Sequence, residues 1–372
     1  MKMNSLPSRS AISASLLLAA FSWHLAAQKL PEPTKLWTVG PLTKPVTVGG
    51  VSFGPGGAQF SGLHEDTQTQ SIYAATRSMA FAGDRIVLAS RTGARQIEGA
   101  AVPASVYRLL SLDAQTGEVK DTREILAFGS LGLFAANDAH LIVAGRSVMR
   151  LTPDLKDDGV FDYAANGHKS GSVENISPDG STLGNATSPG FELIDTRTLK
   201  PTEITKSGAV GTSVNDRGFV TDNVKWVRDY PKDSGFVTYT DASDEHLLYH
   251  GDCAGRPQFL TNALILEPGC KSPPILDTHG NVVRTLAVKG YYSFAGVSQN
   301  GKRFALQFAT FSSETHSLKK ESFVIYSVET GEPLTAVTPP EKADEQSWTA
   351  FSPDGTLFVV GSPMKLALYR LP

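Results

Sequence analysis

The stretch FSPDGTLFVVGS, residues 351–362, joins a tight-turn tetrapeptide to a run of residues that favour β-strands. In a hairpin turn, Ser352 takes the first position, Pro353 presets φ for the second and Asp354 suits the third. Gly355 supplies the positive φ that closes the turn. The flanking residues are β-branched or aromatic, as paired strands prefer. The stretch therefore predicts a β-hairpin and not a phosphate-binding loop, which would need a glycine-rich turn opening a helix.

The same unit recurs along the chain. The upstream copies are NISPDGSTLGNA (175–186), GVSQNGKRFALQF (296–308), SVNDRGFVTD (213–222), AFAGDRIVLAS (80–90), LFAANDAHLIVAG (133–145) and QFLTNALIL (258–266). The seven units are anchored near Phe81, Phe134, Ile176, Val214, Phe259, Val297 and Phe351. A second turn follows most of them, as in LDAQTGEVK (112–120) and SVETGEPL (327–334).

Two linked hairpins make a four-stranded antiparallel sheet, and such sheets repeated at about 40–50 residues are typical of a β-propeller. We expect an all-β fold: a seven-bladed β-propeller with four-stranded antiparallel blades. The blades should start near residues 76, 130, 172, 208, 256, 292 and 346. Residues 224–251 contain no clear second turn, so the strands of blade four are not assigned there.

The last unit has only three strands before the chain ends, whereas TKLWTVG (34–40) is a spare strand before the first unit. Adding this N-terminal strand to the last blade would close the ring and hide two sheet edges that could pair with other chains. We therefore expect one propeller domain over residues 28–372, closed by residues 34–40.

The SPDG turn followed by a strand, and then a DxxTG-like turn, resembles the YVTN-type and WD-repeat-like propellers of exported bacterial proteins. The resemblance covers residues 34–372 and concerns turn and core residues. This group includes the β-propeller subunits of quinoprotein amine dehydrogenases, lactonases and many binding proteins. The resemblance thus implies the architecture but leaves the function open.

The N-terminus has the pattern of an export signal. Lys2 and Arg9 give a basic start, an apolar stretch rich in small residues follows, and Ala27 is the preferred cleavage point. Residues 1–27 are therefore expected to be a signal peptide, and the mature protein to be secreted or periplasmic, with no membrane span. A formal net charge of −3 argues against a nucleic-acid-binding surface.

The two cysteines, Cys253 and Cys270, lie at equal distances from the expected first turn of blade five. Residues equidistant from a hairpin turn face each other across the two strands, and an exported protein permits disulfides. We predict a structural disulfide; a metal pair or a redox pair is less favoured because neither a CxxC spacing nor a histidine cluster is present.

Long polar insertions at 91–105, 222–235 and 310–322 are expected on one face of the ring, opposite the short turns. Binding residues gather on loops of rigid scaffolds, although solvated decoration is an equal alternative. The candidate binding residues are Arg91, Arg95, Trp226, Arg228, Tyr230, His316 and Lys319. The KWVRDY segment (225–230) combines aromatic surface with a cation, a mixture enriched at recognition sites, unless its tryptophan packs inside a blade.

Motifs for catalysis or cofactors are absent from the sequence. His246 and His250 are four apart, which on a regular strand places both on one face, but no third metal ligand accompanies them. There is no CxxCH haem motif, no GxSxG serine motif and no calcium loop. We therefore expect no catalytic residue, no metal and no cofactor.

Two functions remain. The first is a non-catalytic extracytoplasmic protein, expected to be a monomer, that binds a protein, peptide or glycan on the long-loop face. The alternative is a propeller enzyme or redox subunit of the lactonase, lyase or quinoprotein-associated type. Propeller enzymes can place a few polar residues around the channel mouth without a linear motif, so the choice between them stays open.

Overall fold

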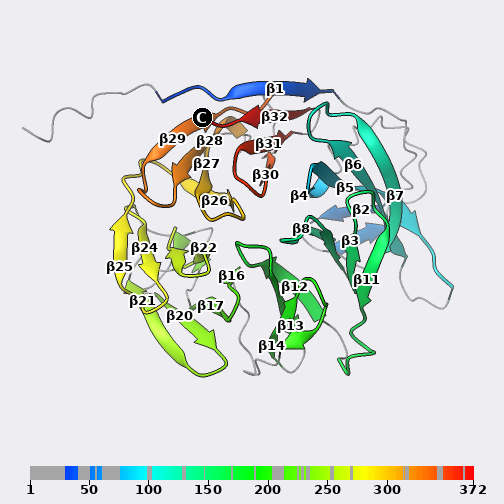
Figure 1. Ribbon diagram of the computed structural model, residues 1–372, viewed down its shortest axis with the longest axis horizontal. Helices are drawn as coiled ribbons and strands as arrows, with labels where there is room; N and C mark the ends of the chain where they lie inside the picture. Colours follow the sequence, from blue (N-terminus) through cyan, green and yellow to red (C-terminus); the bar gives the residue numbers. More distant parts are fainter. Residues whose placement is uncertain are drawn as a thin grey trace, which may run out of the picture.

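A computed structural model describes residues 30–40, 51–54, 57–60, 76–98, 103–127, 131–145, 147–168, 171–187, 190–202, 213–223, 226–227, 230–231, 235–251, 255–268, 271–312, 314, 318–341, 347–362 and 365–372. Viewed down the shortest axis, the strands form a ring (Figure 1). The described residues form strands and turns without any helix, and hence without a helix long and apolar enough to span a membrane.

The first three blades follow one another in chain order, each with its strands ordered from the centre of the ring outward. Blade one is β4 (Thr76–Ala82), β5 (Arg85–Arg95), β6 (Ala104–Asp113) and β7 (Val119–Ala127). Blade two is β8 (Gly132–Ala135), β9 (Leu141–Ala144), β10 (Val148–Leu151) and β11 (Asp157–Phe161). Blade three is β12 (Gly171–Ile176), β13 (Thr182–Thr187), β14 (Phe191–Asp195) and β15 (Pro201–Thr202).

Four more blades complete the ring. Blade four is β16 (Ser213–Val214), β17 (Gly218–Asn223), β20 (Gly235–Asp241) and β21 (Glu245–Gly251). Blade five is β22 (Gln258–Thr261), β23 (Leu264–Leu266), β24 (Pro274–Asp277) and β25 (Val282–Thr285). Blade six is β26 (Tyr292–Val297), β27 (Arg303–Phe311), β28 (Leu318–Ser327) and β29 (Pro333–Val337). Blade seven is β30 (Trp348–Phe351), β31 (Leu357–Gly361), β32 (Leu366–Arg370) and β1 (Thr34–Val39). The chain is a seven-bladed β-propeller.

The expected ring closure is confirmed. Strand β1 pairs antiparallel with β32, from Thr34 opposite Arg370 to Val39 opposite Leu366 (Figure 1). Trp37 extends the closure to blade one, because its indole Nε1 donates to the Ala114 carbonyl at 3.0 Å. The N-terminal strand thus supplies the missing fourth strand of blade seven and also contacts its neighbour.

All seven repeat anchors lie on the innermost strands of the blades. The turn that follows each SPDG-type anchor has the expected chemistry: Gly180, Gly301 and Gly355 have φ of 73°, 65° and 70°. In blade seven the Ser352 hydroxyl accepts from the Leu357 N–H at 2.9 Å, while the Gly355 N–H donates to the Ser352 carbonyl at 2.8 Å. The serine therefore closes the turn with its side chain and its backbone together.

The hydrophobic core is divided among the blade interfaces. Seven clusters of buried side chains each join one pair of neighbouring blades, because successive residues of a strand point to opposite faces. The cluster between blades three and four is the smallest, with four buried residues centred on Phe191 and Phe219, whose ring centroids are 4.4 Å apart. Each blade is therefore stabilised from both sides.

Blade four contains the strands that the sequence left unassigned. Its second turn is Asp241–Asp244, where the Asp241 carboxylate accepts from the N–H groups of Ser243 and Asp244 at 2.8 and 3.0 Å. The Ser243 hydroxyl and these N–H groups lower the pKa of Asp241 despite opposition from burial. A separate two-stranded ribbon, β18 (Trp226–Val227) and β19 (Tyr230–Pro231), lies between β17 and β20.

The inner turns of distant blades meet near the axis of the ring. Gln299 of blade six donates from Nε2 to the Ala135 carbonyl of blade two at 2.6 Å. Asn262 of blade five donates from Nδ2 to Asp179 of blade three at 2.8 Å. Gly180 lies where these turns converge: a Cβ there would be 2.7 Å from the Ala135 carbonyl oxygen and would also overlap the Gln299 amide. Hydrogen bonds across the ring therefore tie its inner turns together.

We call these hydrogen-bonded inner turns around Gly180 the hub. Their close packing predicts that G180A lowers the stability of the fold. The substitution adds steric overlap to a left-handed backbone conformation, so we expect it to lower the free energy of unfolding by roughly 2–4 kcal/mol. The matched control is G290A, because Gly290 has φ 94° but no atom within 4 Å of the added Cβ. The control should lose only about 1 kcal/mol. Urea unfolding followed by tryptophan fluorescence measures both; equal losses would contradict a closely packed hub.

Candidate functional site

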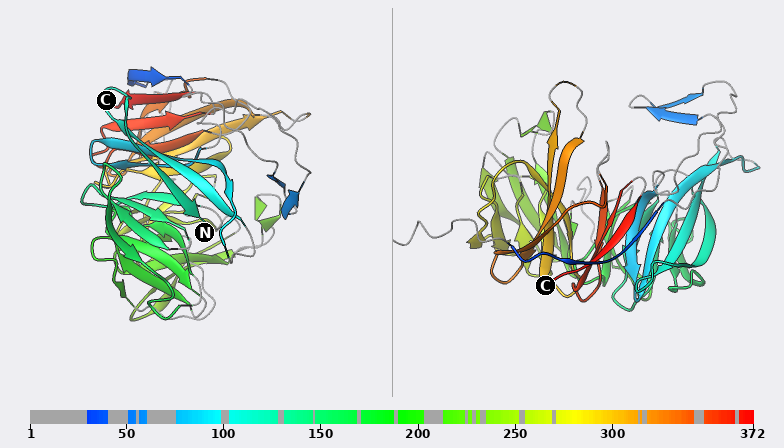
Figure 2. Two further views of the ribbon diagram at one scale, coloured as in Figure 1. Left: turned by 90° about the vertical axis from the view of Figure 1, so that its right-hand side faces the viewer. Right: turned by 90° about the horizontal axis from the view of Figure 1, so that it is seen from above.

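The two faces of the ring differ. On the face that carries the turns between strands one and two and between strands three and four, the connections are short; we call it the short-turn face. The opposite face carries the connections between strands two and three and between blades; we call it the long-loop face. Its extensions include the ribbon β2 (Val51–Gly54) and β3 (Gly57–Phe60), coloured blue, and the orange hairpin β27–β28 (Figure 2).

Most of the expected insertions are extensions of blade strands and not irregular loops. Residues 91–95 belong to β5, and residues 310–311 and 318–322 belong to β27 and β28. The ribbon β18–β19 fills part of the connection in blade four and lies on the same side of the ring as β2–β3 (Figure 2). In the part of the chain that the structure describes, the long-loop face therefore carries hydrogen-bonded hairpins that project beyond the ring.

Exposed aromatic side chains gather at this face. Phe236 near the start of β20, Tyr291 just before β26 and Phe311 at the end of β27 are 39%, 49% and 46% exposed. The other large exposed hydrophobic residues among the described ones are aliphatic and lie on the outermost strands: Leu126, Val160, Leu247, Val282 and Val283. The exposed aromatic side chains among the described residues thus lie at the long-loop ends of blades four and six.

The two candidate arginines do not converge. Arg91 lies opposite Tyr107 and Arg95 opposite Ala104, with a β-bulge between them. Because Tyr107 and Ala104 are three apart on β6, the two arginines point to opposite faces of the hairpin. Arg95 lies 3.8 Å from the Glu124 carboxylate, in an ion pair exposed to solvent. A single anion is therefore not held between them.

The other candidates are distributed as follows. Trp226 and Tyr230 lie on β18 and β19, outside the four strands of blade four, so Trp226 does not belong to a blade strand. Lys319 lines a cavity of about 250 Å³ at the long-loop end of blade six. Arg228, His316 and both cysteines lie outside the described residues. The described turn of blade five, Asn262–Ala263, lies beside the expected midpoint of the cysteine pair.

The histidine pair on β21 does not share a face. A β-bulge between the two places His246 opposite Tyr239 and His250 opposite Phe236, which are three apart on β20. The interpretation of a one-faced pair is therefore wrong, since the bulge reverses the alternation. The His246 ring Nε2 instead lies 2.7 Å from the Thr278 carbonyl of blade five. Within the described part of the chain, no cluster of three or more metal-ligating residues is found.

A buried polar chain between blades two and three was not anticipated. The His168 imidazole Nε2 lies 2.8 Å from Glu192, whose side chain is 9% exposed. Asn185 donates to the other oxygen of this carboxylate at 3.3 Å, and Tyr163 donates to Asn185 at 2.9 Å. The residues are spread over 163–192 with no motif spacing. Asn185 and Glu192 face each other across β13 and β14, and the connection between blades two and three packs Tyr163 and His168 against them. The carboxylate orients the imidazole at the long-loop end of this interface.

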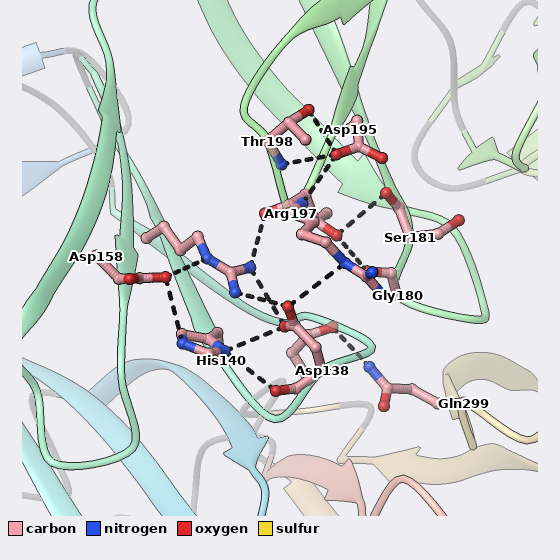
Figure 3. Close-up of polar contacts among 12 residues, drawn as sticks. Asp138, His140, Asp158, Gly180, Ser181, Asp195, Arg197, Thr198 and Gln299 are labelled. Atoms are coloured by element: carbon pink, nitrogen blue, oxygen red, sulfur yellow. Dashed lines mark hydrogen bonds and ion pairs between the residues drawn. The ribbon is translucent and has the colours of Figure 1, made fainter.

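The short-turn face holds a second network, centred on Arg150. Figure 3 shows its partners Asp138, His140 and Asp158 close together. The Arg150 guanidinium is 5% exposed and donates to Asp138 and Asp158 at 2.6 Å each. It also donates to the Thr196 carbonyl of blade three at 2.9 Å, and His140 lies between the two carboxylates. Burial opposes ionisation of Asp138, but Arg150 and His140 outweigh it and lower the pKa of Asp138. This network joins two blades.

No protein-family profile matches the sequence, and no curated protein matches it. Among solved structures, the chain is similar to the C-terminal WD40 domain of Sif2, with a TM-score of 0.44 and 8% identity over 80% of this chain and 96% of that one. It is also similar to BamB from Moraxella catarrhalis, with a TM-score of 0.40 and 12% identity over 91% of this chain and 100% of that one. The similarity concerns fold alone, so the functional argument rests on the geometry above.

Arg150 should stabilise the protein in a pH-dependent way. R150M leaves Asp138 and Asp158 without their buried cation, so we expect a loss of about 3–5 kcal/mol at pH 7. A carboxyl whose folded pKa is lowered contributes stability above its unfolded pKa of about 3.9 and loses it as the pH falls through the folded value. The penalty of R150M should therefore shrink below about pH 4.

The matched control is R123M, because Arg123 also bonds a carboxylate, Asp157 at 2.8 Å, but 62% of that aspartate side chain is exposed. We expect this control to lose about 1 kcal/mol or less. Chemical denaturation at pH 3, 5 and 7 measures both variants. A penalty for R150M that does not change with pH would contradict the electrostatic role.

Proposed function

We propose that this protein is a non-catalytic, exported binding propeller, a monomer whose long-loop face takes a protein, peptide or glycan partner. The observation that carries the proposal is the difference between the two faces. Exposed aromatic side chains and projecting hairpins lie on the long-loop face, whereas short turns and hydrogen bonds across the ring close the other. The candidate residues Trp226, Tyr230 and Lys319 belong to this same face.

Aromatic side chains supply large contact area at a low cost in conformational entropy, and they dominate binding hot spots. Hairpins whose backbone groups are already paired in a β-ladder lose little further freedom when a partner binds. The hub of inner turns holds the blades that carry these hairpins in fixed relation. A rigid ring with adaptable side chains at one face is therefore suited to recognition.

A second candidate function rests on the pair His168–Glu192. An imidazole oriented by a carboxylate is an arrangement used for general acid–base catalysis, and this one faces the long-loop side. It favours the alternative of a propeller enzyme. Turnover of a lactone or amine substrate by the purified protein, abolished by H168A with the fold intact, would establish this alternative and overturn the non-catalytic proposal.

The binding face can be tested by site-specific photo-cross-linking. A benzoylphenylalanine introduced at Phe311 or at Tyr291 should give a discrete cross-linked product in producing cells, because a partner covers both side chains. The matched control positions are Val282 and Leu247, which are 58% and 56% exposed but lie on outer strands. Mass spectrometry of the products identifies the partner. Cross-links at the outer positions alone would overturn the choice of face.

Export and the disulfide can be tested together. Residues 1–29 lie outside the described residues, and the signal peptide is proposed from the sequence alone. We expect the mature chain to begin at Gln28 and peptide mapping without reduction to show Cys253 linked to Cys270. In the chain-entropy model such a loop stabilises the fold by about 3 kcal/mol, so reduction should lower the denaturation midpoint. Two free thiols in the secreted or periplasmic protein would contradict the disulfide.

A further inference from the structure

Blade six has a strand edge that its own outer strand does not cover. Strand β28 pairs with β27 along its whole length, from Leu318 opposite Phe311 to Ser327 opposite Arg303. The outer strand β29 pairs only with the stretch from Phe323 to Tyr326. Among the described residues, β28 from Leu318 to Ser322 therefore has a strand partner on one side only. This free edge belongs to the projecting hairpin on the long-loop face (Figure 2).

Two features explain why the outer strand stops. Pro339 and Pro340 follow β29 closely, and proline has no N–H to donate to a β-ladder. The chain then turns toward blade seven: the Tyr369 hydroxyl donates to the Thr338 carbonyl at 3.0 Å, and the Ser362 hydroxyl donates to Glu341 at 2.7 Å. Among the described residues, the edge of β28 before Phe323 is therefore unpaired because the chain after β29 turns toward blade seven.

The hydrogen bonds at the end of β28 show which backbone groups face the open edge. The Ser327 N–H donates to Glu332 on the outer side, and the Val328 N–H donates to Lys302 on the inner side. Backbone groups alternate between the two sides of a strand, so odd-numbered residues of β28 from Glu321 to Ser327 point outward; a β-bulge at Lys319, which has no partner on β27, ends this alternation. The N–H and C=O of Phe323 thus meet β29, and those of Glu321 point the same way beyond its end.

Space and charge accompany the edge. The cavity of about 250 Å³ is lined by residues of both segments: Leu318, Lys319, Lys320, Glu321, Thr338, Pro339 and Glu341. Lys319 and Lys320 are exposed, and among the described residues neither ammonium has an ion-pair partner. The Glu321 carboxylate is 8% exposed and accepts from Gln307 and from the Ser347 hydroxyl. Glu341, also in this lining, accepts from the Ser362 hydroxyl. Both glutamates of the cavity are therefore held by neighbouring polar groups, whereas the two exposed lysines flank the edge.

From this geometry we infer that the free edge of β28, from Leu318 to Ser322, binds an extended acidic segment of a partner protein as an added strand. Backbone hydrogen bonds to Glu321 supply the pairing, and Lys319 with Lys320 select acidic side chains. A second copy of this chain is a poor occupant, because its own edge would bring two further lysines against these two. The inference rests on the proposed function and names the chemistry of the partner.

The test uses the full mature chain and defined peptides. The probe is acetyl-Thr-Glu-Val-Glu-Val-Glu-Thr-amide, and its control carries lysine in place of glutamate. At millimolar concentration the acidic peptide should slow hydrogen exchange of the Glu321 amide at least tenfold, whereas the Phe323 amide, already bonded to β29, should change little.

The double variant K319E/K320E should weaken binding of the acidic peptide about tenfold and should favour the lysine peptide. The control variant K200E/K271E alters exposed lysines of other blades and should behave as the parent protein does.

The outcomes separate the inference from the proposed function. Equal binding of the acidic and lysine peptides, or protection that leaves Glu321 unchanged, would overturn strand addition at this edge. If photo-cross-links at Phe311 or Tyr291 persist in that case, the long-loop face still binds a partner by another mode. If those cross-links are also absent, the proposed function itself fails. A shift to dimers that depends on Lys320 would instead identify a second copy as the occupant and overturn the acidic partner.

Discussion

Each blade of this protein has two apolar faces, and the structure depends on covering both. Alternating side chains of β6 show the constraint: Leu109 packs toward blade two and Leu110 toward blade seven. A four-stranded sheet of this kind is stable only between two others, and no blade can be removed without exposing two interfaces. A closed ring satisfies the requirement for every blade at once. The apolar clusters at the seven interfaces and the hydrogen bonds between the inner turns together stabilise the ring.

This constraint also separates stability from function. Strand centres and short turns are committed to packing, capping and hydrogen bonds across the ring, as the Arg150 and Gln299 networks show. Described connections on the opposite face lengthen into hairpins whose ends leave the core. Phe311 and the open edge of β28 both occur where a hairpin extends beyond its blade. The proposed recognition residues therefore lie outside the core, where packing between blades does not restrict the choice of side chain.

The sequence was sufficient for the repeated architecture because its signal is local. Ser352 to Gly355 form one turn within four residues, and the same string at 177–180 forms the same turn. Blade four was expected, but its strands within 224–251 were not assigned because its second turn, capped by Asp241, lacks a glycine. The site was harder to predict. Bulges in β5 and β21 reverse the alternation and separate Arg91 from Arg95 and His246 from His250. The His168–Glu192 pair depends on packing between blades, which no spacing in the chain encodes.

The pairing of β1 with β32 has a consequence for the order of assembly. Thr34 and Arg370 lie on opposite sides of all the other blades in the sequence, so their ladder closes the longest loop of any strand pairing among the described residues. The last blade cannot be completed until the polypeptide has been made as far as β32, whereas blades one to six can form from local hairpins. A partly made chain therefore presents an open arc with an apolar face at each end. Chaperones bind such exposed apolar faces. Deletion of β32 should therefore cause aggregation, because it leaves the ring open at both ends.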